Sequence, residues 1–462
     1  MGDSKRKEML PTLPPGSRVG ESLFLAEGIY VVSGTKRAAV YKTSSREVFS
    51  INASGRNILF GETNDLDYLR QLQNLGIVTD KSFTVPEATK KESASPKIDF
   101  VWFELTPNCN ERCLHCYAEC APISPSTTEN KRRLNFEDWK RAIVAAHDLG
   151  CTSGQFIGGE PFLYRGENRQ TVLDLAQFAR ETGYETVEIF SNATLLTKSK
   201  VRRIKDLELN MAVSLYSSVP EIHDQITKTP GSYAKTVENL MLLHEYEIPT
   251  RVEIILMREN EATVVDTVKF VDAMGFGQTK PDVVRPNGRG GDDNRAPTPE
   301  TQIKYGYILE PDFSVDQAGF SNAQTLNPCL AGKITITENG DVLPCIFSRG
   351  QILGNILSSD LKTLMTSEPL RDVWHTSKDR ILVCQDCEYR YACSDCRPLA
   401  FGANDSRDYL QAPFPRCTYN PHEGEWGNGF WRLNITGQPV YDLNMAQEIE
   451  TQRRTKVLSV KN

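Results

Sequence analysis

The feature that most constrains the fold is an alternation of strand and helix patterns that begins near residue 98. Amphipathic segments, such as NFEDWKRAIVAAHDLG at residues 135–150, separate six short apolar runs. The runs are FVWFEL, SGQFIGG, TVEIFSN, MAVSLYS, RVEIILM and PDVVRP. Repeated βα units imply a parallel sheet or barrel whose chemistry lies on the loops that follow the carboxyl ends of the strands.

Twelve cysteines are distributed unevenly along the chain. Three lie in CNERCLHC, residues 109–116, directly after the first strand, and seven more lie between residues 329 and 417. Thiolates in short loops bind zinc or iron–sulfur clusters, and three thiolates leave one iron of a four-iron cluster without a protein ligand. Such an open metal position is typical of a catalytic site. The other two, Cys120 and Cys151, are predicted to be small buried side chains.

Composition and charge exclude several function classes. With 53 basic and 60 acidic residues the formal net charge is −7, which argues against a general nucleic-acid binder. The first ten residues lack the apolar core of a signal peptide, and no stretch reaches the roughly 18 apolar residues of a membrane span. We therefore predict a cytoplasmic protein with no membrane or nucleic-acid partner, in which clustered thiols indicate metal binding or catalysis rather than disulfides.

The segment before the alternating region reads as a separate module. Residues 20–82 contain three strand patterns, IYVVSG, RAAVYK and EVFSIN, followed by two helical patterns. In the second helix leucines recur from Leu66 to Leu75, and Asn64 or Asp65 is placed to cap its start. Residues 83–97 are polar, contain two prolines and are predicted to be a linker. The order of elements predicts a winged-helix-like module, and an accessory domain is as good an interpretation as a binding domain at this point.

The cysteine loop together with GGEP, residues 158–161 after the second strand, resembles the radical S-adenosylmethionine (SAM) enzymes. In that family three cysteines hold a [4Fe–4S] cluster, SAM chelates the open iron, and the reduced cluster cleaves SAM to a 5′-deoxyadenosyl radical. The resemblance implies the cluster ligands Cys109, Cys113 and Cys116. The SAM contacts that it implies are His115, Tyr117, Gly158, Gly159, Glu160, Ser191, Asn192 and Ser214. Among these, Glu160 would offer its carboxylate to the ammonium group of SAM, and His115 stands where the family usually has an aromatic residue.

The later cysteines resemble the SPASM extension of this family, which binds two auxiliary iron–sulfur clusters. The resemblance implies that auxiliary cluster I takes Cys329, Cys345 and Cys396, and that auxiliary cluster II takes Cys384, Cys387, Cys393 and Cys417. Two departures stand out. Cys393 and Cys396 are separated by two residues where the family usually has three, and Ala323 replaces the cysteine that fully ligated members carry six residues before Cys329. The open position could accept a substrate thiolate, water, Asn322 or a backbone group, and zinc is the alternative for the CxxC pairs taken alone.

The N-terminal module resembles the peptide-recognition domain of enzymes that mature ribosomally made peptides. In that family the leader of the precursor adds as a strand beside the third strand and against the last helix, here residues 47–52 and Leu66 to Leu75. We therefore predict a peptide maturase with three [4Fe–4S] clusters, SAM and an external electron donor such as ferredoxin or flavodoxin. The favoured reaction is a Cys thioether cross-link to a carbon of another residue. Alternatives are a carbon–carbon cross-link or another oxidative change, formylglycine formation as in sulfatase maturation, and a zinc-bearing peptide-binding scaffold. No general acid or base can be named.

These predictions combine into one domain plan of the α/β class. A winged-helix-like domain precedes a partial (β/α)6 TIM-like barrel, and a cysteine-rich iron–sulfur domain follows. The predicted ranges are 20–82 for peptide recognition, 83–97 for the linker, 98–310 for the barrel, 311–420 for the SPASM domain and 421–462 for a C-terminal tail.

Overall fold

The structure is a computed structural model, and it describes residues 9–82, 97–122, 132–277, 279–304, 313–402, 411–427 and 429–443. The predicted linker, apart from Lys97, and the tail beyond residue 443 lie outside these ranges. Contacts divide the chain into two units: one contains Met1–Ala94, Ile303–Ala331 and Asp372–Asn462, and the other contains Ser95–Gln302 and Gly332–Arg371. This division differs from the predicted ranges, because residues 332–371 group with the barrel and the rest of the cysteine-rich region groups with the N-terminal module.

The barrel unit is built on an eight-stranded sheet with the order β11-β10-β9-β8-β7-β14-β15-β16, together with a separate parallel pair, β12 and β13. All six predicted strand patterns form strands, which confirms the predicted fold class. Neighbouring strands from β11 to β14 are parallel. The bounds are β7 (Phe100–Glu104), β8 (Ser153–Ile157), β9 (Thr186–Ser191), β10 (Asn210–Ser214), β11 (Thr250–Glu253), β12 (Ile255–Leu256) and β13 (Asp282–Val283).

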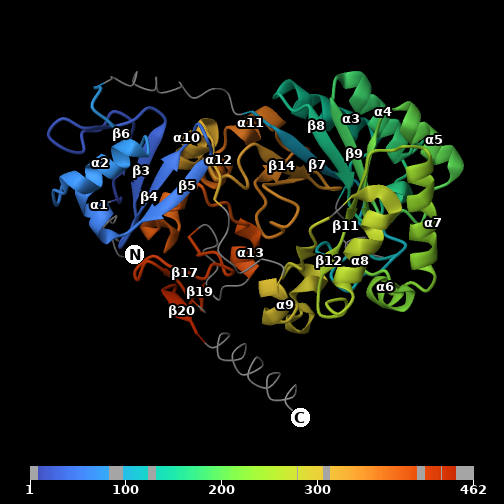
Figure 1. The fold of residues 1–462 in the computed structure, drawn as a ribbon. Helices are drawn as coiled ribbons and strands as arrows, with labels where there is room; N and C mark the ends of the chain where they lie inside the picture. Colours follow the sequence, from blue (N-terminus) through green and yellow to red (C-terminus); the bar gives the residue numbers. More distant parts are fainter. Residues whose placement is uncertain are drawn as a thin grey trace, which may run out of the picture. The chain divides into compact units, whose positions relative to one another are not determined.

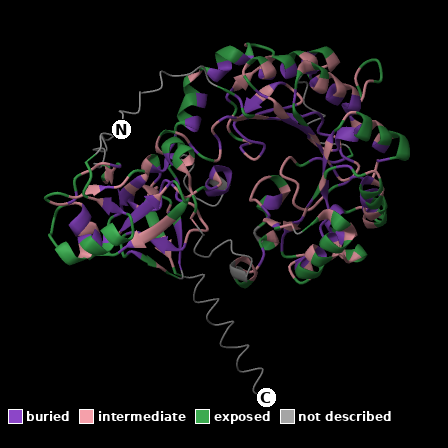
Figure 2. Ribbon diagram, turned by 45° about the horizontal axis from the view of Figure 1, so that its top comes forward, coloured by how far each residue is buried: buried purple, intermediate pink, exposed green. Residues whose placement is uncertain are grey.

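Helices cover the outer side of these strands (Figure 1), and their buried faces turn toward the sheet (Figure 2). The first of them, α3 (Phe136–Asp148), begins at a capping box formed by Asn135 and Asp138, and it buries Trp139 and Ile143 on the predicted face. The other helices of this unit are α4 (Val172–Thr182), α5 (Lys198–Asp206), α6 (Pro220–Thr227), α7 (Ser232–Glu245), α8 (Val264–Val271) and α11 (Leu361–Met365), and α9 (Pro299–Lys304) begins in it.

Three strands extend the sheet beyond its first barrel strand and were not predicted. They are β14 (Lys333–Ile336), which is parallel to β7, and the antiparallel β15 (Asp341–Leu343) and β16 (Gly354–Asn355). The turn between β14 and β15 uses Gly340, whose φ of +85° favours glycine. Because the helical pattern between strands stops in this region, the periodicity gave no sign that the chain returns to the same sheet.

The N-terminal module forms a four-stranded antiparallel sheet in the order β1-β3-β4-β5, followed by two helices. Its bounds are β1 (Thr12–Leu13), β3 (Ile29–Ser33), β4 (Ala38–Lys42), β5 (Glu47–Ile51), α1 (Ala53–Leu59) and α2 (Leu66–Asn74), and a small pair joins β2 (Phe24–Leu25) and β6 (Val78–Thr79). The predicted three strands and two helices are therefore confirmed. Asp65, one of the two predicted caps, accepts the backbone N–H of Tyr68 at 3.0 Å.

Both faces of this sheet are covered. One face packs against α1 and α2 through Val31, Val40 and the buried helix residues Leu69 and Leu72. The other face packs Tyr41 and its neighbours against the rest of the unit. That part consists of α10 (Gln317–Thr325), α13 (Arg397–Gly402), β17 (Tyr419–Asn420), β18 (Glu425–Trp426), β19 (Phe430–Leu433) and β20 (Pro439–Asp442), while α12 (Glu368–Trp374) spans the division between the units.

The outer edge of β5 is the predicted peptide-binding edge. Within the described residues β5 pairs along its length with β4 alone, and a single bridge joins Glu47 to Ser314 at its start. The strand is half-buried between Val48 and Ser50, which leaves polar backbone groups near the surface.

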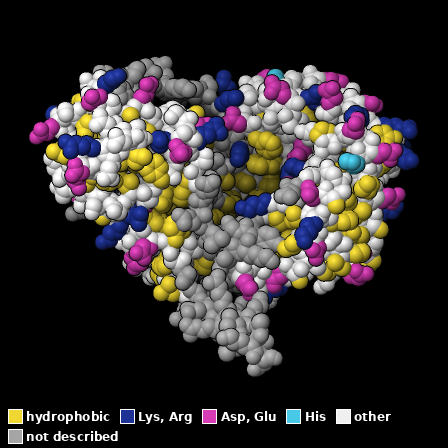
Figure 3. Space-filling model, in the orientation of Figure 1, with side chains coloured by type: hydrophobic (Ala, Val, Ile, Leu, Met, Phe, Trp, Pro, Cys, Tyr) yellow, Lys and Arg dark blue, Asp and Glu magenta, His cyan; other side chains and the backbone are white. Residues whose placement is uncertain are grey.

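On the face that Figure 3 shows, Lys and Arg side chains lie among Asp and Glu side chains rather than in one basic patch. In the described ranges no helix is long and apolar enough to cross a membrane.

Candidate active site

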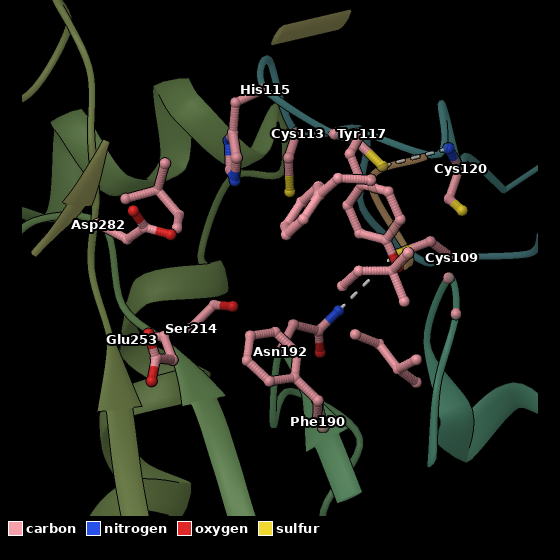
Figure 4. A pocket seen from close by; sticks show the side chains of 18 of the residues that line it. Cys109, Cys113, His115, Tyr117, Cys120, Phe190, Asn192, Ser214, Glu253 and Asp282 are labelled. Carbon is pink, nitrogen blue, oxygen red and sulfur yellow. Dashed lines mark hydrogen bonds between the residues drawn. The ribbon is translucent and has the colours of Figure 1, made fainter. Parts of the chain in front are cut away.

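A cavity of about 480 Å³ lies inside the barrel unit, between the strands and the loops that follow them. Cys109 and Cys113 line one part of it, and Ser214, Glu253 and Asp282 line another (Figure 4). Cys116 also lines the cavity. Aromatic side chains such as Phe190 complete the wall. The cavity therefore has a thiol-rich end, a carboxylate-rich end and an apolar wall.

The loop that carries the three cysteines is held by its own backbone and by a neighbouring helix. The amide of Cys109 donates to the carbonyl of Ala121 at 3.1 Å, so the loop closes on itself. The amides of Arg112 and Leu114 donate to the last turn of α6 at 3.0 and 2.9 Å. These bonds satisfy backbone groups that a buried loop would otherwise leave unpaired, and they fix the directions of the cysteine side chains.

The GGEP loop is attached directly to the cysteine loop. The amide of Gly159 donates to the Thr106 carbonyl at 2.6 Å, and the amide of Glu160 donates to the Asn108 carbonyl at 2.8 Å. A Cβ on Gly159 would lie 2.0 Å from the Asn108 oxygen, so only glycine allows this approach. The sequence analysis assigned Gly158 and Gly159 to contacts with SAM. In the structure the backbone of Gly159 joins the GGEP loop to the cysteine loop.

Glu160 is fully buried and does not line the cavity. Its carboxylate accepts hydrogen bonds from the Phe162 amide at 3.1 Å, the Ser191 hydroxyl at 2.8 Å and the Asn192 amide at 3.0 Å. Burial raises the pKa of Glu160, and these three donors oppose that shift. The structure therefore gives Glu160 a positioning role that ties the second barrel loop to the third, and its contact with the ammonium group of SAM stays a prediction.

The other residues predicted to contact SAM all line the cavity. They are His115, Tyr117, Gly158, Gly159, Ser191, Asn192 and Ser214. Asn192 Nδ2 lies 3.9 Å from Cys109 Sγ and donates to Asn110 at 3.0 Å. Burial lowers the pKa of His115 to about 3, so its ring is a neutral acceptor or donor, and it packs edge-on to Tyr216 at 4.6 Å.

The thiols have unequal acidities. Burial raises the pKa of Cys109 and Cys113, whereas hydrogen bonding from Cys120 lowers the pKa of Cys116 to about 6. Glu111, which the sequence did not single out, is buried beside them and accepts a hydrogen bond from Cys113 Sγ at 3.3 Å. Burial raises the pKa of Glu111 to about 8. Cys120 and Cys151 are buried as predicted, and Cys120 also lines the cavity.

Arg289 is a second residue that the sequence did not reveal. Its side chain donates to the carbonyls of Cys113 and Cys120, both at 2.8 Å, and its amide donates to the Cys116 carbonyl at 3.1 Å. The adjacent Gly288 leaves room for this contact, because a Cβ there would meet the Cys116 and Tyr117 oxygens at 2.6 Å, and a Cβ on Gly290 would meet the Arg285 oxygen of the same segment at 2.4 Å. The available signal was the glycine-rich run NGRGG after the sixth strand, which is typical of a close approach between backbones.

The cavity fits a cluster with bound SAM by the chemistry of its lining. Three thiols at one end are soft ligands suited to iron–sulfur clusters. Two buried polar atoms near them, Glu111 Oε1 and His115 Nδ1, have no hydrogen-bond partner among the described residues and so can serve a polar ligand. Within the described residues no three His, Cys, Asp or Glu side chains are close enough to hold a single metal ion.

The predicted ligands of auxiliary cluster II lie together in the N-terminal unit. Burial is the first cause that raises the pKa of Cys387, Cys393 and Cys417, and a neighbouring thiol of the same set raises each of these pKa values further. For the other set, Cys329 and Cys396 belong to this unit and Cys345 to the barrel unit, so that set stays a prediction. Ala323 is buried in α10 against the N-terminal sheet, where its small side chain packs as part of the core.

Comparison with known protein families finds two matches. Residues 103–271 match the radical SAM superfamily, and residues 329–388 match SPASM, an iron–sulfur cluster-binding domain. These domains imply [4Fe–4S] clusters and SAM as cofactors. The curated relatives include the antilisterial bacteriocin subtilosin biosynthesis protein AlbA of Bacillus subtilis, which is 25% identical over 73% of this chain and 76% of AlbA. They also include an AdoMet-dependent heme synthase of Methanosarcina barkeri, 23% identical over 69% of this chain and 96% of the synthase.

Solved structures share the fold. SuiB of Streptococcus suis bound to SAM superimposes with a TM-score of 0.52 over 86% of this chain and all of SuiB, at 14% identity. The protein anSMEcpe with bound AdoMet and a peptide named Cp18Cys superimposes with a TM-score of 0.51 over 68% of this chain and 94% of that protein, at 17% identity. At such identities the likeness shows the fold alone.

Proposed function

Because this chain carries a radical SAM domain and a SPASM iron–sulfur cluster-binding domain, we propose that it is a maturase that forms Cys thioether cross-links in a ribosomally synthesised precursor peptide. The observation that carries the proposal is the cavity: three thiols, seven of the eight predicted SAM residues and a carboxylate-rich end open onto one space. The alignment with AlbA, a bacteriocin biosynthesis protein, covers 76% of AlbA. The structure of SuiB has been solved with its precursor peptide SuiA bound.

Each residue of the site has a separate task. Cys109, Cys113 and Cys116 would hold the cluster, and the neutral His115 ring and Ser214 would contact SAM. When reduced, this pair of cofactors supplies a 5′-deoxyadenosyl radical that removes a hydrogen atom from the substrate. Arg289 and Glu160 hold the loops that carry these groups. The apolar wall near Phe190 and Ile255 excludes water from the reacting carbon.

Thioether formation also needs an electron acceptor. Joining a Cys sulfur to a carbon that has lost a hydrogen atom releases one proton and one electron. The acceptor proposed here is auxiliary cluster II, held by Cys384, Cys387, Cys393 and Cys417. Cys329, Cys345 and Cys396 are proposed to hold auxiliary cluster I, whose open position would accept the substrate thiolate.

The precursor would be recognised by the N-terminal module. A leader peptide could pair with the outer edge of β5, which is open beyond Glu47 in the described structure. In the same module, Leu66 at the start of α2 and Leu75 at its C-cap are 57% and 61% exposed, whereas the helix buries Leu69 and Leu72. An open strand edge and exposed leucines in one module suit a peptide that brings alternate apolar side chains.

A second candidate is oxidation of a tetrapyrrole, because AdoMet-dependent heme synthases match over nearly their whole length. Those relatives correspond to 69% of this chain. The peptide proposal gives the N-terminal module a role, whereas tetrapyrrole oxidation does not. Mass spectrometry after turnover distinguishes the two, because a thioether lowers the mass of the peptide by two hydrogens and a changed porphyrin is seen by absorbance.

The first test measures iron and sulfide. About twelve irons per chain in the anaerobically purified protein, falling to about eight when Cys109, Cys113 and Cys116 are all replaced by Ala, would match three four-iron clusters with one in the barrel. Cys113→Ala should abolish SAM cleavage, and Cys151→Ala is the matched control because that buried thiol lies outside the cavity. Zinc with little iron would overturn the proposal.

The recognition role is tested on the surface of α2. The double variant Leu66→Asp, Leu75→Asp should raise the KM for the full-length precursor at least tenfold, because it replaces exposed apolar contacts by charge. SAM cleavage without peptide should be unchanged. Met241→Asp, at a 46% exposed position on α7, is the matched control. An unchanged KM for the double variant would contradict leader binding at this helix.

A further inference from the structure

Exposed cations lie on the segments that flank the cysteine loop. The segments are residues 110–114 of that loop, residues 192–198 after β9, and residues 226–235 from the last turn of α6 to the first turn of α7. The cations that they expose are Arg112, Lys198, Lys228 and Lys235, which together are called the basic surface. The acidic residue in these segments, Glu111, is buried. Because the whole chain has a net charge of −7, the basic surface is a local feature rather than a result of composition.

Hydrogen bonds attach the cysteine loop to both flanking segments. The Arg112 amide donates to the carbonyl of Thr227, the last residue of α6, at 3.0 Å, and Lys228 follows directly. The side chain of Asn110 donates to Thr194 Oγ1 at 2.8 Å. The exposed Arg112 and Lys228 are therefore held next to each other by backbone that is itself bonded.

The other two cations face one groove. Lys198, Lys235 and Thr194 line this groove, which has a volume of about 480 Å³. Thr236, which follows Lys235, donates to the Asn192 carbonyl at 2.9 Å and so holds the start of α7 on the loop before α5. The basic surface thus lies within the barrel unit, on the side that carries α5, α6 and α7 (Figure 1).

The basic surface adjoins the proposed ligands of the barrel cluster. Arg112 immediately precedes Cys113 in the cysteine loop. Cys109 Sγ lies 3.9 Å from Nδ2 of Asn192, and the loop that begins at Asn192 ends where α5 starts at Lys198. Electron transfer slows steeply with distance, so a protein that reduces a cluster in this loop must dock close to these thiols.

The charge of this surface is positive after its neighbours are counted. Glu238 pairs with Lys235 at 3.2 Å, and Asp224 accepts backbone amides next to the start of α7. These two carboxylates stand against four cations. In the part of the chain that the structure describes, ion pairs are absent from Arg112, Lys198 and Lys228. Residues 123–131, which lie outside the described ranges, contain one Glu and one Lys and add no net charge. An exposed excess of positive charge is complementary to an acidic partner.

We propose that Arg112, Lys198, Lys228 and Lys235 form the docking surface for the external electron donor, and that this donor is an acidic protein that carries one electron at a time. The proposal rests on the proposed function, because it requires a cluster at Cys109, Cys113 and Cys116. In this step the donor is oxidised by one electron, the cluster is reduced by one, and no bond forms or breaks. Opposite charges speed the encounter and orient the donor, and salt weakens both effects.

The first measurement is the affinity for an acidic flavodoxin. The oxidised flavodoxin is titrated into the anaerobically purified full chain at low and at high salt. Lys198→Glu, Lys228→Glu should raise the Kd about tenfold or more at low salt and remove most of its salt dependence. Lys198→Arg, Lys228→Arg keeps both charges and should bind as the wild type does.

The matched control makes the same change of charge at the amino ends of the barrel strands. Lys97, 67% exposed, precedes β7, and Lys205, 49% exposed, lies in the last turn of α5 beside Glu247. Lys97→Glu, Lys205→Glu should leave the Kd unchanged. An equal rise of the Kd in the control and in Lys198→Glu, Lys228→Glu would show a general charge effect and would overturn the proposal.

The second measurement separates docking from damage to the cluster. Formation of 5′-deoxyadenosine is followed with reduced flavodoxin and, separately, with reduced methyl viologen, a small cation that needs no docking surface. Lys198→Glu, Lys228→Glu should slow the reaction with flavodoxin about tenfold or more at low salt and should not slow the reaction with methyl viologen. An unchanged rate with flavodoxin, or an equal loss with both reductants, contradicts the docking role.

Other occupants and failure of the underlying function give different results. If the double reversal leaves flavodoxin binding intact but abolishes binding to vesicles of phosphatidylcholine and phosphatidylserine, the surface takes a membrane and the proposal is wrong. If the wild type holds no more iron than the variant with Cys109, Cys113 and Cys116 replaced by Ala, the barrel cluster is absent and the proposed function itself fails. If methyl viologen supports SAM cleavage and flavodoxin binding ignores these charges, only the docking surface fails.

Discussion

Arg289 holds the cysteine loop at three points, two through its guanidinium and one through its amide. Arg289→Met removes the two side-chain hydrogen bonds, each of which is worth about 1.5 kcal/mol or more when the donor is charged. We expect the Kd for SAM to rise at least tenfold and the iron of the barrel cluster to fall. Isothermal titration with SAM checks this. Arg258→Met, at a half-exposed arginine outside the cavity, is the control, and equal Kd values for the two variants would contradict the assigned role.

His223 supports the same wall of the cavity and gives a pH dependence. Its Nδ1 accepts the Tyr216 amide at 3.2 Å, which requires a neutral ring, and burial lowers the pKa of His223 to about 4 despite Asp224. The unfolded state, with a pKa near 6.5, binds the proton first as pH falls. This contribution to the free energy of unfolding is therefore complete above about pH 6.5 and falls by on the order of 3 kcal/mol toward pH 4.

The measurement compares urea unfolding of the apo protein and of His223→Gln at pH 7 and pH 4.5. The wild type should lose more stability than the variant on acidification. His375→Gln, at an exposed position, should behave as the wild type does. Parallel losses in wild type and His223→Gln would contradict the neutral, buried state of this ring.

At the scale of elements, backbone hydrogen bonds join two loops that follow neighbouring strands. The bonds from Gly159 and Glu160 to residues 106 and 108 join the GGEP loop to the cysteine loop. Parallel strands bring their carboxyl ends to one edge, so loops that are 50 residues apart in the sequence can share hydrogen bonds. The parallel pairing of β7 with β8 brings the two loops together.

The variant Gly159→Ala tests the contact between the GGEP loop and the cysteine loop. Its Cβ would lie 2.0 Å from the Asn108 oxygen, so one of the two loops must move. We expect SAM cleavage to fall at least tenfold and the melting temperature of the barrel unit to decrease. Gly350→Ala is the control, since no atom lies within 4 Å of its Cβ. Normal cleavage in Gly159→Ala would show that the loops can separate without harm.

At the scale of the whole molecule, the N-terminal sheet is part of the same unit as the four cysteines proposed to hold auxiliary cluster II. Tyr41 donates to the Glu388 carbonyl at 2.8 Å, and it packs with Phe320, Tyr389 and Tyr419. Deleting residues 1–82 would uncover this core, whereas the barrel unit keeps its own core. We therefore expect the truncated chain to retain SAM cleavage but to lose about four irons.

Iron analysis and SAM cleavage of the truncated chain check this expectation. The Leu66→Asp, Leu75→Asp variant is the matched control, because it changes the peptide-binding surface without exposing the core and should keep all irons. A truncated chain with its full iron content would show that the sheet is not needed to hold the cluster. The point variants, and not the deletion, are therefore the test of leader recognition.

The sequence by itself determined the six barrel strands, three of the N-terminal strands with their two helices, and the position of the cysteine loop directly after the first barrel strand. Each of these depends on a local pattern: alternation along a strand, periodicity along a helix, or short spacing in a loop. Seven of the eight predicted SAM contacts line the cavity for the same reason, because they lie directly after strands or within the cysteine loop.

Only the tertiary structure decided which distant segments meet. The addition of β14 to β7, the hydrogen bonds from Arg289 to the cysteine loop and the three donors on Glu160 each join residues far apart in the chain or in segments without periodicity. Burial, which is the first cause of most of the pKa shifts in the site, depends on that packing. A local sequence pattern carries no information about this tertiary packing or about the pKa shifts that follow from it.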